Sequence, residues 1–493
     1  MLFNSLHFLL FFLIVTSFFF LIPKKIKTPF LLAASCYFYM AFIPAYILIL
    51  IFTIVIDYYA GILIEKSDGR RRKIFLVVSL ISNISILCFF KYFNFINENI
   101  SVLLNSIGYI NHIPKLSFLL PIGLSFHTFQ AMSYTIEVYR GKQSAERNFY
   151  TYSLYVMFYP QLVAGPIERP QNLLHQFKEN HLFEYQRVVD GLKLMAWGMF
   201  KKVVIADRLS EMVDFVYNNP FSFKGFPLII ATIFFAFQIY CDFSGYSDIA
   251  IGSAQVMGFK LMRNFDSPYF ASSISEFWRR WHISLSTWFK DYLYIPLGGN
   301  RVVKWRMCYN LFLTFFISGL WHGANWTFII WGVVHGLYLV ISILCEPIKN
   351  IFNRIFSIGP KNIFINTLGI INTFILVTFA WIFFRAASFQ DAKHIITKFF
   401  IATKPQFRIL KSGNEEAFTK FIYLGTNKIN FIIAILSIVL LLLVDYLQGK
   451  GDFRQKISHA NPIYKWFSYA LFIVLILYFG VFNKNVQFIY FQF

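Results

Sequence analysis

The sequence contains little charge. Only 14% of its 493 residues are Asp, Glu, Lys or Arg, whereas 57% are hydrophobic. Ordinary water-soluble domains carry about 25% charged residues, so this composition excludes a water-soluble fold. Phe alone contributes 63 residues, and side chains of this size must fill both the protein interior and the boundary with lipid. The chain is therefore predicted to be a membrane protein.

Cysteine is also scarce, and its positions form no pattern. The five cysteines are scattered and include no CxxC pair: Cys36, Cys88, Cys241, Cys308 and Cys345. Disulfide scaffolds and structural zinc sites both need closely spaced cysteines. The sequence therefore predicts neither of them, and no bound metal.

Acidic residues are few beside basic ones, 24 against 45, which gives a net charge of +21. A surplus of this size is compatible with nucleic-acid binding, but the Lys and Arg residues lie in short segments between apolar runs. Charge distributed in this way orients a protein in a membrane. We therefore predict a lipid environment and no nucleic-acid partner.

The N-terminus lacks the basic segment that precedes the apolar core of a signal peptide. Instead, Lys24, Lys25 and Lys27 follow the first apolar run, Leu6–Leu21. This order predicts a retained helix with its N-terminus outside. The basic cluster KSDGRRRK (66–73) and later clusters fit the same inner side, so both termini are predicted to be periplasmic.

Apolar runs long enough to span a bilayer, about 20 residues each, recur along the chain. They lie near 6–22, 28–44, 46–64, 74–95, 226–241, 309–320, 326–344, 363–384, 429–447 and 464–482. We predict an all-α, polytopic membrane protein with about ten or more transmembrane helices. No repeat or linker divides it. One membrane-embedded domain over 1–493 is expected, with rim helices in 1–100, a core in 118–344 and C-terminal helices in 363–493.

Prolines and charges break the apolar runs of region 118–300. Such sequence at membrane depth must be buried in protein or must line a water-filled cavity, so a functional site is expected in this region. Three polar blocks stand out: YPQLVAGPIERP (159–170), CDFSGYSDIAIG (241–252) and EFWRRWHISLSTWFKDYLYIPLGGNR (276–301). A fourth, SGLWHGANW (318–326), follows one apolar helix later.

His322 is the leading candidate for catalysis. A neutral imidazole in an apolar tunnel can take a proton from an attacking hydroxyl, although a hydrogen-bonded structural histidine is the alternative. A continuous helix would place Asn325 about 60° from His322 on the same face. Gly323 is expected to leave room for a substrate, and Trp326 to support the tunnel.

Other polar residues admit two interpretations. His335 would point about 140° away from His322 on an unbroken helix, so we interpret it as structural. His282, preceded by Glu276 and Arg280, is either a capping histidine or a second polar group in the tunnel. Two carboxylates, Asp242 and Asp248, fit metal or proton transfer less well than pairing with Arg279, Arg280 or Lys290.

Taken together, these blocks resemble the membrane-bound O-acyltransferase (MBOAT) family. The similarity is to its bacterial alginate and peptidoglycan O-acetyltransferase branch, and also to the D-alanyl exporters of teichoic acids. It extends over essentially the whole chain. The motifs that carry it are PIGLSFHTFQAMSYTIEVYRG (121–141), FYPQLVAGPIERP (158–170), FQIYCDFSGYSDIAIG (237–252), FWRRWHISLSTWFKDYLYIPLGGNR (277–301) and SGLWHGANWTFIIWGVVHG (318–336).

The resemblance implies a helical rim around a thin centre, where a donor from the cytoplasm meets an acceptor from outside. The family's catalytic histidine falls on His322, and its second polar position falls on His282. The implied donor is acetyl-CoA, whose phosphates Lys290 or Arg301 are placed to attract. At the C-terminus, Tyr490 in FIYFQF (488–493) is a candidate acyl relay, with an interfacial aromatic belt as the alternative.

The expected activity is therefore acetyl transfer across the bacterial inner membrane for O-acetylation of an envelope polysaccharide, peptidoglycan or an alginate-like exopolysaccharide. A separate SGNH-like periplasmic acetyltransferase is the implied partner, because no such domain is fused here. Two alternatives stay open at this point. One is a transporter that exports a glycan or small anion, and the other is an MBOAT enzyme that uses D-alanine or a lipid acceptor.

Overall fold

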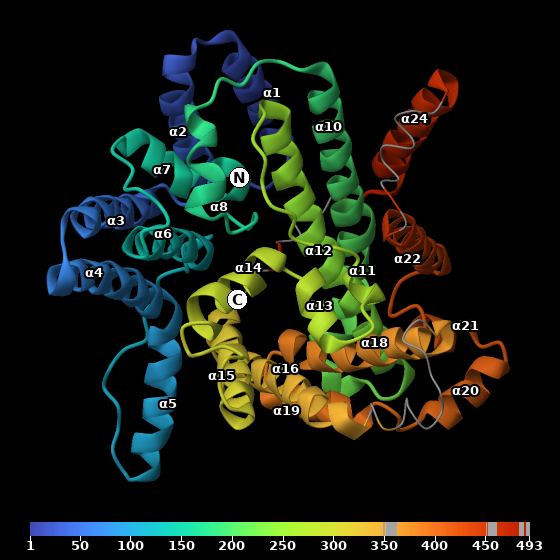
Figure 1. Cartoon of the computed structure of the whole chain (residues 1–493). Coiled ribbons are helices and arrows are strands. Elements are labelled where there is room, and N and C mark those ends of the chain that lie inside the picture. Colours follow the sequence, from blue (N-terminus) through green and yellow to red (C-terminus); the bar gives the residue numbers. More distant parts are fainter. Residues whose placement is uncertain (349–350, 352–361, 450, 452–460, 483–487, 490–493) are drawn as a thin grey trace. The chain divides into compact units, whose positions relative to one another are not determined.

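The structure is a computed structural model. It describes all residues except 349–350, 352–361, 450, 452–460, 483–487 and 490–493. Helices are the only regular secondary structure in the part of the chain that it describes (Figure 1). The predicted all-α class is thereby confirmed.

Six helices in the described residues are long and apolar enough to cross a membrane: Pro44–Lys66, Gly69–Ser106, Phe226–Met257, Trp326–Leu344, Ile363–Arg385 and Lys428–Gly449. Leu6–Leu21 and Ile463–Phe479 are shorter apolar helices. The remaining predicted runs, 28–44 and 309–320, lie largely in two further helices, α2 (Lys24–Met40) and α15 (Lys304–His322). The chain is a multi-pass membrane protein, as the apolar runs predicted.

The chain divides into two compact units. Unit 1 comprises Met1–Met195 and Tyr246–Arg263, and unit 2 comprises Ala196–Gly245 and Asn264–Phe493. Two helices, α10 (Tyr185–Met199) and α12 (Phe226–Met257), contribute residues to both units. Whether the units act as the single domain expected from the sequence stays a prediction.

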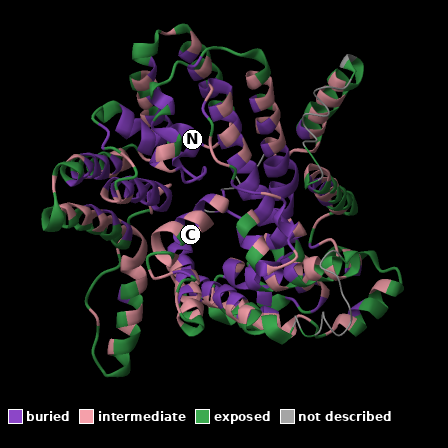
Figure 2. Cartoon of the chain, viewed as in Figure 1, coloured by how far each residue is buried: buried purple, intermediate pink, exposed green. Residues whose placement is uncertain are grey.

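The remaining elements of unit 1 precede α10. They are α1 (Leu6–Leu21), α2, η1 (Pro44–Tyr46), α3 (Ile47–Lys66), α4 (Gly69–Leu87), η2 (Cys88–Tyr92), α5 (Phe93–Ser106), α6 (Leu124–Tyr139), α7 (Phe149–Met157), α8 (Tyr159–Leu162), α9 (Pro170–Leu173) and η3 (Gln176–Lys178). Helices α3, α4 and α6 pack against one another. Figure 2 shows buried positions along almost the whole of α6.

A buried carboxylate joins these three helices. Asp57 of α3 accepts hydrogen bonds from Ser79 Oγ (2.6 Å) and from Asn83 Nδ2 (2.9 and 3.0 Å) of α4. Ser79 Oγ also lies 3.0 Å from Thr135 Oγ1 of α6. Polar contacts of this kind hold helices together in lipid, where hydrophobic burial no longer drives their association.

Unit 2 holds the elements that follow α10 and flank or follow α12. They are η4 (Phe200–Ala206), α11 (Asp207–Tyr217), η5 (Pro220–Ser222), η6 (Pro268–Phe270), α13 (Ile274–Arg280), α14 (Ile283–Phe289), η7 (Lys290–Tyr294), α15, α16 (Trp326–Leu344), α18 (Ile363–Arg385), α19 (Phe389–Lys398), α20 (Thr403–Lys411), α21 (Glu415–Phe421), α22 (Lys428–Gly449) and α24 (Pro462–Phe479).

Polar side chains define where several helices of unit 2 begin. Ser273 Oγ accepts the Glu276 N–H at the start of α13, and Asn325 Oδ1 accepts the Thr327 N–H at the start of α16. Ser388 caps α19 in the same way. Each side chain satisfies a backbone donor that a helix leaves open at its first turn. The polar blocks seen in the sequence thus contain residues that begin helices as well as candidate functional residues.

Candidate active site

Helices α15 and α16 approach each other backbone to backbone. A Cβ at Gly332 of α16 would lie 2.3 Å from the Phe315 carbonyl oxygen of α15, and a Cβ at Gly319 would lie 2.5 Å from the Phe328 carbonyl oxygen. Only glycine fits at such a crossing, as in the small-residue contacts of many membrane helices. This pair of helices carries the motif SGLWHGANWTFIIWGVVHG (318–336) and positions His322.

His322 is the last residue of α15 and is only 4% exposed. Its ring lies in edge contact with those of Trp331, Trp321 and Phe384, with centroids 4.8, 5.0 and 5.4 Å away. Trp331 and Phe384 come from α16 and α18, so three helices enclose the imidazole. The buried setting expected from the sequence is present.

These rings belong to a larger group, which we call the aromatic cluster. Trp331 stacks on Trp381 (5.9 Å), and Trp381 contacts Trp281 (5.1 Å). Trp331 also contacts Trp278 of α13 (5.6 Å). The cluster comprises Trp278, Trp281, Trp321, Trp331, Trp381 and Phe384, and it includes half of the 10 tryptophans in the chain.

The predicted relation between His322 and Asn325 is wrong. The helix ends at His322, and both Gly323 (φ −163°, ψ 151°) and Asn325 (φ −148°, ψ 147°) are extended. Asn325 instead caps α16 and donates to the Ala387 carbonyl at 3.1 Å. The expected space beside Gly323 is also filled, because a Cβ there would lie 2.2 Å from the ring of Phe328.

His335 lies closer to His322 than an unbroken helix would allow, because the chain turns between them. Both imidazoles contact the Trp331 indole, with centroids 4.8 and 4.9 Å away. His335 Nδ1 accepts a hydrogen bond from Trp278 Nε1 at 3.3 Å. His335 therefore fixes one tryptophan of the aromatic cluster, in keeping with a structural role.

His282 is fully buried between α13 and α14, with a left-handed backbone (φ 43°, ψ 55°). Asn264 holds the turn: its carbonyl accepts the Ile283 N–H, and its side-chain oxygen accepts from Ser284 N and Oγ. The imidazole contacts Phe243 (4.5 Å) and Trp321 (6.4 Å). Since Trp321 also contacts His322, one indole adjoins both candidate histidines.

Glu276 and Arg280 form an ion pair in α13, outside the candidate spanning helices. Arg280 Nη2 and Nε lie 2.6 and 3.1 Å from Glu276 Oε1. Burial acts to raise the pKa of Glu276, but hydrogen bonds from Ser272 and the charge of Arg280 lower it below the ordinary value. Arg280 is thus occupied by Glu276, and the expected pairing with Asp242 is not seen.

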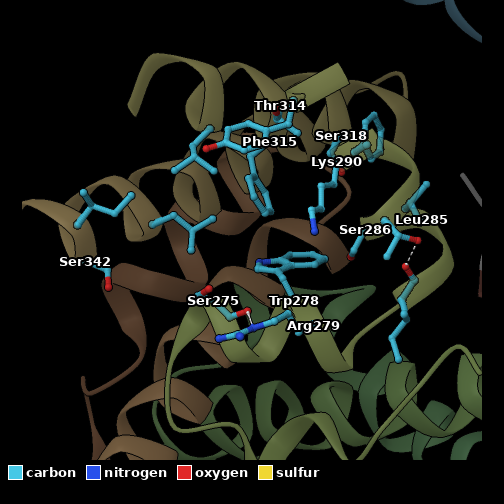
Figure 3. A pocket seen from close by; sticks show the side chains of 17 residues that line it. Ser275, Trp278, Arg279, Leu285, Ser286, Lys290, Thr314, Phe315, Ser318 and Ser342 are labelled. Carbon is cyan, nitrogen blue, oxygen red and sulfur yellow. Dashed lines mark hydrogen bonds between the residues drawn. The ribbon is translucent and has the colours of Figure 1, made fainter. Parts of the chain in front are cut away.

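A cavity of about 380 Å³ opens beside the aromatic cluster, within unit 2 (Figure 3). Its wall includes the Trp278 indole and Ser318, which lies one helical turn before His322. Two exposed cations, Arg279 and Lys290, also line it. His322 itself is not a lining residue, and the rise of α15 from Ser318 to His322 is about 6 Å.

Asp242 has a cationic partner that sequence spacing did not suggest. Its Oδ1 lies 2.7 Å from Lys202 Nζ, which also lies 2.8 Å from Asp207 Oδ1. The expected partners Arg279, Arg280 and Lys290 are therefore incorrect for Asp242. Lys201 and Lys202 in an apolar segment were the available signal, because an intramembrane charge marks a functional candidate.

The other predicted site residues are dispersed. Asp248 is half-buried on the part of α12 that belongs to unit 1, and Trp326 is 54% exposed at the start of α16. Arg301 is exposed and does not line the cavity. Tyr490 lies outside the described residues. Within those residues, no three His, Cys, Asp or Glu side chains gather as a metal site would require.

The FYPQLVAGPIERP block belongs to unit 1. Tyr155 Oη donates to the Glu168 carbonyl at 2.9 Å, and the Glu168 carboxylate accepts the Met262 N–H. Glu168 is fully buried. These contacts stabilise the fold of unit 1, so the block has a structural use of its own.

The fold and the buried histidines define a multi-pass helical membrane protein with a polar site among tryptophans. A family model described as "MBOAT, membrane-bound O-acyltransferase family" matches residues 80–384. The chain belongs to this family and is an acyltransferase, as its motifs predicted.

Among its relatives is the probable alginate O-acetylase of Pseudomonas aeruginosa, 38% identical over 402 residues, which cover 80% of this chain and 73% of that protein. The peptidoglycan O-acetyltransferase of Helicobacter pylori is 36% identical over 393 residues, 74% of this chain and 72% of that protein. The teichoic acid D-alanyltransferase of Bacillus subtilis is more distant, 26% identical over 292 residues, 57% of this chain and 72% of that protein.

The close crossing of α15 and α16 leads to a first prediction. Gly332→Ala should force the two helices apart and reduce stability by about 1–3 kcal/mol, the usual cost of overpacking. Thermal unfolding in detergent measures the effect. Gly336→Ala is the matched control on the same helix, because its Cβ would meet no atom closer than 3.3 Å. Equal stability of the two variants would contradict this account of the helix crossing.

Proposed function

We propose that this acyltransferase takes acetyl from cytoplasmic acetyl-CoA and delivers it across the bacterial inner membrane for O-acetylation of an envelope polysaccharide. His322 acts as its general base. The observation that carries the proposal is the continuity between cavity and histidine. Trp278 lines the cavity and contacts Trp331, whose ring lies 4.8 Å from that of His322.

The cavity suits the donor. Pockets of about 300–1,000 Å³ hold small molecules through apolar walls and a few polar groups, and this one combines Trp278, Phe315 and Leu339 with Ser275, Ser286 and Thr314. Lys290 and Arg279 supply positive charge for the phosphates of coenzyme A. Arg301 adds to the basic field outside the cavity. The acetyl thioester then points along α15 toward His322.

The reaction converts the thioester of acetyl-CoA into an oxygen ester of the acceptor and releases the thiol of coenzyme A. An acceptor hydroxyl loses its proton to His322 as its oxygen bonds to the thioester carbonyl carbon. The carbon–sulfur bond then breaks, and the thiolate of coenzyme A takes the proton from the imidazolium. A neutral imidazole in a water-poor pocket is suited to both steps. His282, across Trp321, provides a second polar group near the path.

The indole N–H of Trp331 is the hydrogen-bond donor that we propose for the transition state. Its indole is fully buried, and Nε1 has no acceptor among the described residues. A hydrogen bond to the carbonyl oxygen would stabilise the negative charge that develops during attack, in the manner of an oxyanion hole. Acyl transfer requires a base that removes the proton and a hydrogen-bond donor that stabilises the developing negative charge, and His322 and Trp331 would supply the two side by side.

The relatives suggest the acceptor. The names of two of them specify alginate and peptidoglycan, so we propose a polysaccharide acceptor of this kind and an SGNH-like periplasmic acetyltransferase as partner. Tyr490 is the proposed carrier of acetyl between the two enzymes, since a phenol is a better leaving group than a sugar alkoxide. The more distant D-alanyltransferase makes D-alanine the alternative acyl group.

The proposed orientation follows from charge. Lys24–Lys27, 66–73 and 301–306 lie on the cytoplasmic side, and both termini lie on the periplasmic side. In this arrangement the two compact units serve a single acyltransferase domain over 1–493. The support is the basic residues that follow α1 and lie at or near the starts of α4 and α15.

Loss of His322 tests the proposed activity. His322→Ala should reduce transfer of label from acetyl-CoA at least 100-fold, since general-base catalysis contributes about 10²–10⁴-fold. Purified protein, reconstituted with the polysaccharide acceptor and partner, is assayed for labelled glycan. His175→Ala, at an exposed histidine of unit 1, is the control. Unchanged transfer by folded His322→Ala protein would reject the assignment, and transfer of D-alanine alone would reject acetyl.

The role of Trp331 has a separate test. Trp331→Phe keeps a buried ring but removes the N–H, so kcat should fall by about 10²-fold, in the range measured for single oxyanion donors. Steady-state kinetics with labelled acetyl-CoA give the value. Trp381→Phe is the matched control, because Trp381 stacks on Trp331 within the same cluster. If both variants lose activity equally, packing and not the N–H explains the effect.

The cavity cation gives another expectation. Lys290→Ala should raise KM for acetyl-CoA about tenfold with little change in kcat, because removing one charge-assisted hydrogen bond costs about 1.5 kcal/mol. Added salt should shrink the difference between variant and wild type. Lys304→Ala serves as the control, since Lys304 is exposed but does not line the cavity. A KM that does not respond to Lys290→Ala argues against this cavity as the donor site.

A further inference from the structure

The C-terminal end of the chain returns to the interior of unit 2. Helix α24 ends at Phe479, yet Phe488 and Ile489 are only 1% and 3% exposed. Both side chains are therefore enclosed by other residues of unit 2. The contacts of these two residues identify what holds them.

The Ile489 backbone binds to a group of charges on η4, α11 and α12. Its N–H donates to Asp242 Oδ2 at 2.7 Å, while Asp242 Oδ1 lies 2.7 Å from Lys202 Nζ. Lys202 Nζ also lies 2.8 Å from Asp207 Oδ1. We call Lys202, Asp207 and Asp242 the charge cluster. All three side chains are at most 5% exposed.

The geometry of η4 explains why this cluster exists. Residues Phe200–Ala206 form a π-helical segment, in which Lys201 and Lys202 are both buried. Lys201 Nζ donates to Ser244 Oγ at 2.9 Å, so the two consecutive lysines reach different residues of α12. Wider π turns of this kind are frequent at functional sites.

Two further bonds hold the chain that leads to Ile489. Val481 N–H donates to the Val203 carbonyl of η4 at 2.9 Å, and Arg208 Nη2 donates to the Phe479 carbonyl at 2.6 Å. Among the described residues, η4, α11 and α12 therefore bind the backbone at Phe479, Val481 and Ile489.

The anchored end adjoins the reaction centre. The Phe488 ring contacts Phe243 with centroids 5.9 Å apart, and Phe243 is in edge contact with His282 at 4.5 Å. His282 in turn shares Trp321 with His322. A continuous line of packed rings thus connects the C-terminal end to the proposed base.

We propose that the charge cluster is an anchor for the C-terminal end of the chain, and that Asp242 and Phe488 are positioning residues for the reaction centre. The proposal rests on the proposed function for its effect on catalysis, though not for the anchoring itself. Asp242 fixes the Ile489 backbone, this fixes the Phe488 ring, and the ring supports Phe243 against His282. The carboxylate acts through the chain terminus without touching a substrate.

Removing one N–H tests the effect on catalysis. Ile489→Pro deletes the N–H that donates to Asp242 but changes none of the three charged side chains, and Ile489→Ala is the matched control that keeps the N–H. We expect kcat for acetyl transfer to fall at least about tenfold in Ile489→Pro, because the variant loses one hydrogen bond to a charged group. KM for acetyl-CoA should stay unchanged, because Ile489 does not line the donor cavity. Equal kcat in the two variants would overturn the positioning role.

Hydrogen–deuterium exchange tests the anchor without any assay of activity. In the wild-type full chain, the peptide containing Phe488 and Ile489 should exchange slowly, and Asp242→Asn should speed its exchange at least about tenfold. Asp214→Asn, at the partly exposed Asp214–Arg385 pair, is the control and should leave this peptide unchanged. Fast exchange in the wild type, or no response to Asp242→Asn, would overturn the anchor.

The two measurements keep this proposal distinct from the proposed function. Failure of wild-type protein to consume acetyl-CoA would reject the function but leave the exchange result valid. Slow exchange lost in Asp242→Asn, together with a tenfold lower kcat in Ile489→Pro, supports both the anchor and its role. Slow exchange with unchanged kcat supports the anchor and overturns the positioning of the reaction centre.

Discussion

The approach of α15 to α16 at Gly319 and Gly332 is the contact on which the candidate active site depends. Because these positions carry no side chain, the two backbones come within van der Waals distance. The chain then turns after His322, and the extended residues Gly323 and Asn325 lie in that turn. The turn brings Trp331 against His322 and His335 against the same indole. A wider crossing would separate these rings and open the imidazole to lipid.

The aromatic cluster gives the histidine an environment with little water. Large flat rings supply much contact area with few rotatable bonds, so they hold His322 in a defined position. Their few polar atoms, such as the indole N–H of Trp331, are then the groups best placed to interact with a carbonyl. Low local polarity strengthens every such interaction.

The buried charge cluster joins η4, α11 and α12 of unit 2. Lys202 between Asp207 and Asp242 is costly to bury, and such a group persists only where each charge has good partners. The Ile489 N–H adds one partner that is available only when the C-terminal end is docked. The stability of the cluster and the position of the terminus are therefore coupled. Breaking either one leaves the other with an unsatisfied group.

Composition and the spacing of apolar runs by themselves determined that this chain is an all-helical, multi-pass membrane protein, and the resemblance of its motifs to known proteins indicated the O-acyltransferase family. They also singled out His322, because a buried histidine among tryptophans is recognisable in one short segment. Only the tertiary structure decided the rest. The break at Gly323 follows from helix packing, and the Asp242–Lys202 pair joins α12 to a π-helical segment 40 residues earlier. Contacts between distant segments depend on how helices cross, which local spacing does not encode.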